Sequence, residues 1–224
     1  MPMGVDRPLA VFFDLDGTLA DTAEDLAAPI HAMRADRGLA PMPDEELRPY
    51  ASMGARGLIL KGLGVAREDP GFEPLRLEFL RRYEAAMLVR TRLFPGMPEV
   101  LDALDDAGIR WGVVSNKFER YVRPILAGLG LLERSVCAVG GDTTPHSKPH
   151  PEPLLHGARL AAVDARQCVY VGDDLRDIEA GHAAEMLAIA AAYGFCGGDS
   201  PPERWGADHL ISQPLELLDL LRLR

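Results

Sequence analysis

The chain has 224 residues, of which 47% are hydrophobic, and its formal net charge is −10. This length suits a single α/β domain or a core domain with a small insertion. The acidic balance argues against nucleic acid or an anionic membrane surface as the main partner, and it requires a local cation wherever an anionic substrate binds.

Residues 1–8 lack the basic region and apolar core of a secretory signal, and no apolar run approaches the length that spans a bilayer. Three cysteines at positions 137, 168 and 196 are widely spaced and odd in number, so a disulfide framework is not expected. We therefore expect a cytoplasmic protein without a membrane partner, either a monomer or a homodimer.

The first predicted element is a strand over the apolar run Leu9–Phe13, which is directly followed by DLDGT at residues 14–18. A continuous apolar run is typical of a strand buried on both faces, and parallel sheets present functional groups at the carboxyl ends of their strands. The carboxylates of Asp14 and Asp16 repel each other. A nearby cation and different roles for the two acids would explain why both are present.

Residues 21–89 have helical rather than strand patterns. A first helix is expected to run toward Arg37, bent near Pro29, and a second covers residues 72–88, where apolar side chains recur every four positions. Turns rich in glycine and proline are expected around residues 41–43 and 54–64. We therefore divide the chain into an α/β core, residues 1–20 and 90–224, and an inserted all-helical unit, residues 21–89.

After residue 90, apolar runs alternate with helical patterns. Strands are expected over residues 109–115, 135–139, 167–171, 187–191 and 209–211, and helices over 120–129, 152–162 and 175–184. A leucine-dense run at residues 215–221 predicts a final helix docked on the core. The alternation predicts a Rossmann-like parallel sheet covered by helices.

Polar residues also follow two of these later strands. Ser115 ends the strand at 109–115, and the run GDDLRD occupies residues 172–177 after the strand at 167–171. Lys148 lies in the loop HSKPHP at residues 146–151. Because the carboxyl ends of parallel strands meet at one edge of a sheet, we expect these carboxylates, the hydroxyl and the ammonium to form one site.

The order of these groups resembles the haloacid dehalogenase superfamily of phosphohydrolases over the whole chain. The run at 14–18 is similar to the first motif of that family, Ser115 to the second, Lys148 to the third and the run at 172–177 to the fourth. The resemblance implies that residues 21–89 form a mobile cap. Residues 95–97 and 115–117 are most similar to phosphoglycolate phosphatases, and residues 33–38 and 172–177 to bacterial N-acetylmuramic acid 6-phosphate phosphatases.

Asp14 is the candidate nucleophile, which would form an aspartyl-phosphate that water later hydrolyses. Mg²⁺ suits an all-oxygen site, with the Asp14 carboxylate, the Asp16 main-chain carbonyl and Asp173 as expected ligands. The Asp16 side chain is then free to act as general acid and base. Ser115 would donate to a phosphoryl oxygen, and Lys148 would balance the charge of Asp14 and the phosphate.

Further candidates surround this set. Gly17, Thr18 and Asn116 are expected to complete a phosphate cradle through backbone N–H groups. Lys117 and Arg56 are candidate substrate contacts, Arg56 because the loop at residues 52–57 is the expected part of the cap that faces the site. A bidentate pair between Arg56 and a substrate carboxylate and a plain place on a helix surface remain alternatives.

Asp174 and Asp177 lie at the predicted start of a helix. Either residue can cap that helix or support the metal from behind Asp173, and the two roles are compatible. The histidines at 146, 150 and 156 raise the question of zinc, but the sequence indicates no carboxylate or cysteine that completes a ligand set, so we expect surface histidines.

The sequence thus predicts an enzyme that hydrolyses a small phosphorylated metabolite with Mg²⁺, with 2-phosphoglycolate as the first substrate. One alternative keeps the chemistry and changes the ester to a sugar phosphate such as N-acetylmuramic acid 6-phosphate. Others are a hexose-phosphate mutase and an inactive binding module on the same fold.

Overall fold

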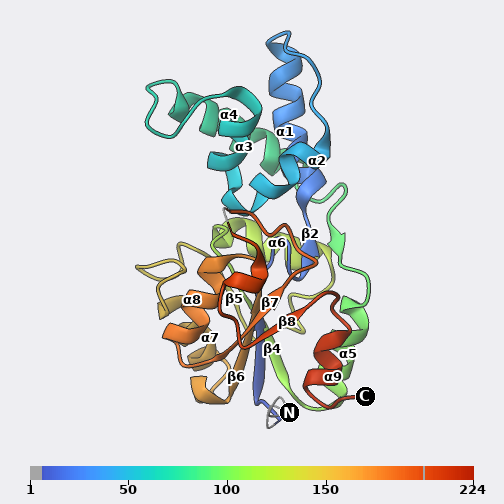
Figure 1. Ribbon diagram of the computed structural model, residues 1–224. Coiled ribbons are helices and arrows are strands. Elements are labelled where there is room, and N and C mark those ends of the chain that lie inside the picture. Colours follow the sequence, from blue (N-terminus) through green and yellow to red (C-terminus); the bar gives the residue numbers. More distant parts are fainter. Residues whose placement is uncertain (1–6, 199) are drawn as a thin grey trace.

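The computed structural model describes residues 7–198 and 200–224 (Figure 1). Within these residues a six-stranded parallel sheet has the strand order β5-β4-β1-β6-β7-β8. Its strands are β1 (Ala10–Phe13), β4 (Arg110–Val114), β5 (Ala138–Val139), β6 (Cys168–Gly172), β7 (Leu187–Ala191) and β8 (His209–Ile211). The predicted α/β class with a Rossmann-like parallel sheet is confirmed.

Helices cover both faces of this sheet (Figure 1). They are α5 (Met97–Asp106), α6 (Glu119–Gly128), α7 (Glu152–Leu160), α8 (Leu175–Ala183) and α9 (Glu216–Leu220). Alternate side chains of β1 reach opposite faces. Val11 and Phe13 pack into the cluster with residues of α5, α6 and α9, whereas Phe12 packs with residues of α7 and α8. Burial on both faces explains why β1 reads as an unbroken apolar run.

The helical segment above the sheet contains α1 (Ala23–Asp36), α2 (Asp44–Leu47), α3 (Gly54–Leu63) and α4 (Phe72–Ala86), with a 3-10 helix at Arg48–Met53 (Figure 1). Pro29 lies inside α1. The expectation of turns at residues 54–64 is wrong, because α3 occupies nearly all of them. Its glycines allow close packing: a Cβ at Gly62 would lie 2.3 Å from Cγ2 of Ile30.

A two-stranded antiparallel ribbon joins the helical segment to the sheet. It consists of β2 (Ala20–Asp21) and β3 (Arg92–Leu93), in which Ala20 pairs with Leu93. Beside it, the buried Asp25 accepts hydrogen bonds of 2.8 to 3.1 Å from the N–H groups of Val89, Arg90 and Thr91, and one of 2.8 Å from the Thr91 hydroxyl. One carboxylate therefore fixes the returning chain against the start of α1.

Among the helices of the described residues, none combines the length and the apolar character needed to span a membrane.

Candidate active site

A cavity of about 270 Å³ lies where the residues after β1, β4 and β6 meet the helical segment. Of the residues predicted from the sequence, those that line it are Asp14, Asp16, Ser115, Asn116, Lys117, Lys148, Asp173, Asp174 and Asp177. Gly17, Thr18 and Arg56 are not among the lining residues. The carboxyl ends of the strands thus bring together most of the predicted set, as the parallel topology requires.

Lys148 is the buried cation of this cavity. Its Nζ atom lies 3.1 Å from Oδ1 of Asp14 and 2.6 Å from Oδ1 of Asp177. It also donates to the Tyr170 hydroxyl at 2.7 Å and to the main-chain oxygen of Val114 at 3.2 Å. Burial would lower the pKa of Lys148, but the Asp14 and Asp177 carboxylates outweigh it and raise this pKa above its usual value. Lys148 therefore stays charged beside the candidate nucleophile.

Asp173 lies in a close-fitting pocket of backbone. Its carboxylate accepts hydrogen bonds from the Thr18 hydroxyl at 2.8 Å and from the Phe195 N–H at 2.9 Å. A Cβ at Gly17, where φ is +85°, would lie 2.1 Å from Oδ2 of Asp173, and a Cβ at Gly194 would lie 2.3 Å from its Cβ. Gly17 and Thr18 therefore position Asp173, and the sequence missed this role when it placed both in a phosphate cradle.

Three carboxylates of this site form a candidate cation centre. Asp14, Asp173 and Asp177 each offer an oxygen, and these atoms all lie within 4.8 Å of one another. Burial raises the pKa of Asp173 well above its ordinary value, and the Asp14 and Asp177 charges add to the shift. Burial likewise raises the pKa of Asp177 to about 6, against the opposing effect of Lys148. An oxygen-binding cation would relieve this repulsion, so the residues fit Mg²⁺.

The Asp16 side chain is not part of this group of three carboxylates and has partners of its own. Its Oδ1 accepts a hydrogen bond of 2.6 Å from the Thr22 hydroxyl, and its two oxygens lie 2.9 and 3.0 Å from Nζ of Lys117. That ammonium also lies 4.7 Å from the ring centroid of Tyr83 on α4. Lys117, predicted as a substrate contact, is thus already engaged with Asp16.

Ser115 and Asn116 follow β4 at the base of the cavity. Ser115 is buried, and its Oγ accepts a hydrogen bond of 3.3 Å from the Lys117 N–H. The Asn116 side chain accepts from the Lys148 N–H and donates to the Lys148 carbonyl, both at 2.9 Å. Asn116 therefore fixes the backbone from which Lys148 enters the site.

Asp174 and Asp177 form a capping box at the start of α8: the Asp174 side chain accepts from the Arg176 N–H, and Asp177 accepts from the Asp174 N–H. Asp174 also pairs with the Arg176 guanidinium at 2.7 Å. The same guanidinium donates to the main-chain oxygen of Ser52 at 2.9 Å, which links the sheet edge to the helical segment. Asp177, in contrast to Asp174, also belongs to the group of three carboxylates with Asp14 and Asp173, which we call the carboxylate centre.

The arginine that lines the cavity from the helical segment is Arg76 on α4, whereas Arg56 is exposed on α3. Arg76 pairs with Glu73 at 2.6 Å. Ser52 and Tyr83 also line the cavity, and their hydroxyls are buried without a hydrogen-bond partner among the described residues. The sequence pattern marked Tyr83 only as part of an apolar helix face, so its polar end was not predicted.

Comparison with known proteins agrees with this geometry. Residues 11–191 match the family model of haloacid dehalogenase-like hydrolases. The N-acetylmuramic acid 6-phosphate phosphatase of Pseudomonas aeruginosa is 44% identical over 96% of this chain and 95% of its own. The phosphoglycolate phosphatase of Xanthomonas campestris is 46% identical over 94% of this chain and 95% of its own.

The fold is similar to a crystal structure described as a predicted phosphoglycolate phosphatase from Haemophilus somnus. The TM-score is 0.82 and the identity 26%, with 97% of this chain and 99% of the other covered. A second structure, a phosphatase from Clostridium difficile, has a TM-score of 0.83 at 19% identity over 96% and 99% of the two chains and supports the fold alone. The chain belongs to the haloacid dehalogenase-like hydrolases, as a phosphoric monoester hydrolase of that family.

Proposed function

We propose that the protein hydrolyses a small phosphomonoester through an aspartyl-phosphate on Asp14, with 2-phosphoglycolate as the first substrate. The observation that carries this proposal is that one cavity brings together a candidate nucleophile, a buried ammonium, two further carboxylates and a second acid. The Asp14 carboxylate lies 3.1 Å from the Lys148 ammonium and within 4.8 Å of the Asp173 and Asp177 oxygens, and the second acid, Asp16, lines the same cavity.

In the proposed reaction, a carboxylate oxygen of Asp14 attacks the phosphorus atom and the bond to the ester oxygen breaks. Asp16, held by Thr22 and Lys117, gives its proton to the departing oxygen. Water then attacks the aspartyl-phosphate, Asp16 takes the proton of that water, and phosphate leaves. Ser115 and Lys148 bind the phosphoryl oxygens as negative charge shifts among them.

Mg²⁺ is the proposed cofactor. Asp14, Asp173 and the main-chain carbonyl of Asp16 would hold it. The positive charge of Lys148 would balance the negative charge of the neighbouring Asp177. When bound, the ion neutralises carboxylate and phosphoryl charge in a site that burial makes unfavourable for unpaired anions.

We further propose the division into a core, residues 1–20 and 90–224, and a cap, residues 21–89. The cap side of the cavity comes from α1, α4, the 3-10 helix at Arg48–Met53 and the start of α3. The hydrogen bond from Arg176 to Ser52 would then close the cap over a bound ester, and its rupture would let product leave.

A second candidate substrate is a bulkier acidic amino sugar, N-acetylmuramic acid 6-phosphate, on which a relative 44% identical is named to act. The apolar side chains of Leu26, Phe79 and Leu80 line the cavity and would contact an acetyl methyl group. The buried hydroxyls of Ser52 and Tyr83 would pair with sugar hydroxyls. Arg76 would pair with a carboxylate of either substrate.

A panel of phosphate esters distinguishes these functions. Phosphate release would be measured with 2-phosphoglycolate, N-acetylmuramic acid 6-phosphate, N-acetylglucosamine 6-phosphate, glucose 6-phosphate and β-glucose 1-phosphate. A preference in kcat/KM of about a hundredfold for one ester would identify the substrate class. Conversion of β-glucose 1-phosphate to glucose 6-phosphate without phosphate release would indicate a mutase, and no turnover of any ester would contradict the proposed hydrolysis.

A further inference from the structure

The loop that carries Lys148 brings two imidazoles and a carboxylate together on the protein surface. His146 and His150 lie two residues on either side of Lys148, and Glu152 is the first residue of α7. While the Lys148 side chain is 2% exposed and points to Asp14 and Asp177, that of His146 is 59% exposed. The sequence analysis found no carboxylate near these histidines, whereas the structure places Glu152 beside two of them.

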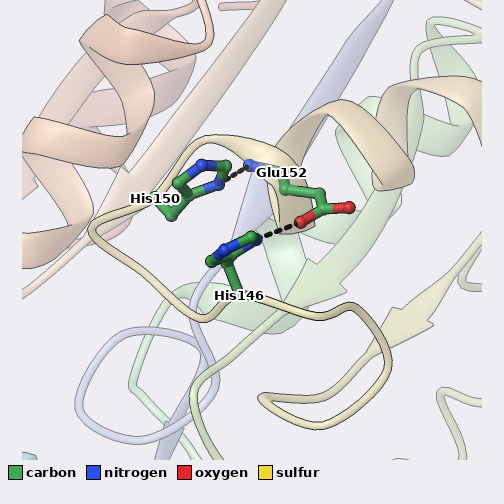
Figure 2. Close-up of side chains that lie close together, drawn as sticks. All are labelled: His146, His150 and Glu152. Carbon is green, nitrogen blue, oxygen red and sulfur yellow. Dashed lines mark hydrogen bonds and ion pairs between the residues drawn. The ribbon is translucent and has the colours of Figure 1, made fainter.

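Figure 2 shows how closely the three side chains approach one another. Nδ1 of His146 donates to Oε2 of Glu152 at 2.8 Å, and Nδ1 of His150 accepts from the Glu152 N–H at 3.2 Å. The two rings are stacked, with centroids 4.2 Å apart and planes 21° from parallel. One donor atom from each side chain lies within 4.8 Å of the others.

We propose that His146, His150 and Glu152 bind a Zn²⁺ ion. Two imidazoles and one carboxylate, with water in the fourth position, are a ligand set that zinc accepts. The ion would take the place of the proton that Nδ1 of His146 now shares with Glu152, and the neutral ring would then carry its proton on Nε2. The donor atoms lie within 4.8 Å of one another, and rotation of the two stacked rings would turn their nitrogens toward one ion.

The backbone holds these ligands in place before any ion binds. The Thr144 hydroxyl donates to the His146 carbonyl at 2.7 Å, and the His150 N–H donates to the Ser147 carbonyl at 3.0 Å. Asn116 fixes Lys148, between the two histidines, through two hydrogen bonds of 2.9 Å. A fixed loop loses little conformational freedom on binding, so more of the interaction energy appears as affinity.

This ligand set differs in chemistry from the carboxylate centre around Asp14. Imidazole nitrogens favour zinc and related transition metals, whereas a site of oxygen ligands favours Mg²⁺. Lys148, which contacts two carboxylates of that centre, lies in the same loop as the histidines, so zinc at the surface would restrain the backbone from which Lys148 reaches Asp14. It would not compete with Mg²⁺ for ligands.

Zinc titrations of the untagged full chain test this site. Zn²⁺ affinity and stoichiometry would be measured by competition with a chromophoric chelator at saturating Mg²⁺, and Co²⁺ absorption would report nitrogen ligands. The variants are His146→Gln/His150→Gln, Glu152→Gln and, as a matched control, His156→Gln one turn further along α7, where His156 contacts Arg159. Asp173→Asn serves as a control for the carboxylate centre.

The wild type, His156→Gln and Asp173→Asn should each bind one Zn²⁺ that the double histidine variant lacks. Glu152→Gln should weaken the binding by about tenfold or more. Circular dichroism would establish that the variants, including the buried Asp173→Asn, are folded. Equal zinc binding by the wild type and the double variant, or loss of the ion from Asp173→Asn, would overturn the proposal.

Discussion

The ammonium of Lys117, after β4, lies 2.9 Å from Oδ1 of Asp16, after β1, and so ties together the ends of two neighbouring strands. Burial would lower the pKa of Lys117, but Asp16 and Tyr83 outweigh it and raise this pKa above its usual value. Lys117 therefore carries its positive charge at neutral pH, and the ion pair orients the proposed general acid.

Lys117→Met should lower kcat by about a hundredfold and leave KM nearly unchanged, because Asp16 loses its partner while the substrate loses none. Lys61→Met is the matched control: Lys61 pairs with Glu46 at 2.6 Å and lies 6.0 Å from the Tyr50 ring, outside the cavity. Steady-state kinetics with the preferred ester measures both. A raised KM with unchanged kcat would identify Lys117 as a substrate contact.

Asp14→Asn should reduce phosphate release by at least about a thousandfold, since an amide does not replace the nucleophilic carboxylate. The exposed Asp106→Asn on α5 should keep wild-type activity. Circular dichroism would show that Asp14→Asn is folded. Substantial remaining activity in a folded Asp14→Asn protein would exclude Asp14 as the nucleophile.

Removal of divalent cations with EDTA should abolish activity, and Mg²⁺ should restore it. Mg²⁺ at about one hundred times its dissociation constant should also stabilise the wild type by about 3 kcal/mol. Asp173→Asn should not gain this stability, because the cation loses a ligand and the repulsion around Asp14 is already reduced. Thermal unfolding with and without Mg²⁺ checks this, and an equal rise in Tm for both proteins would refute the assignment of Asp173.

Asp25→Ala should lower the free energy of unfolding by about 3 kcal/mol, since it leaves the N–H groups of residues 89–91 without their acceptor. Asp36→Ala, at the exposed end of the same helix, should cost less than about 1 kcal/mol although its pair with Arg82 is lost. Urea denaturation measures both changes. Similar losses of unfolding free energy in the two variants would show that the hydrogen bonds of Asp25 to residues 89–91 do not stabilise the fold.

Asp174 predicts a pH dependence of stability. Burial would raise the pKa of Asp174, but Arg176 outweighs it and lowers this pKa below its ordinary value. The folded state thus binds this proton less readily than the unfolded state. The stabilisation is complete above the unfolded pKa of about 4 and is lost as pH falls through the folded pKa.

Asp174→Asn retains an N-cap acceptor and removes only the charge. In EDTA at pH 7 the wild type should be more stable than this variant by about 1 to 2 kcal/mol, and the difference should shrink below about pH 4. Urea unfolding across this pH range measures the difference. A constant difference from pH 7 to pH 3 would contradict a contribution from the Asp174 charge.

The sheet could be predicted because each strand is an apolar run with a helix after it, and the main site residues follow those strands directly. Helix α3 was missed because Gly57 and Gly62 resemble turn residues in sequence. In the structure, a Cβ at Gly57 would lie 2.5 Å from Cβ of Met53, so these glycines serve close packing. The strands β2 and β3, two residues each, are too short to have a period.

Contacts between distant parts of the chain could not be predicted either. The bond from Arg176 to Ser52 spans 124 positions, and the one from Lys148 to Tyr170 spans 22. Neither motif order nor spacing specifies such pairs: the first depends on how the helical segment packs on the sheet, and the second on how the loop that carries Lys148 packs against β6. The pairing of His146 with Glu152 is local, but it depends on the conformation of the loop at residues 146–151, which the sequence did not specify although it predicted a helix from residue 152.

The antiparallel pairing of Ala20 with Leu93 places entry to and exit from residues 21–89 side by side. Neighbouring residues in such a ribbon have Cα atoms only about 5 Å apart, a gap that a short hairpin can bridge. Residues 21–89 are therefore inserted between two points of the chain that lie next to each other in space. Exchanging this segment for that of another phosphatase would give a chimera with altered ester preference, whose turnover also depends on new partners in place of Thr22 and Tyr83 for Asp16 and Lys117.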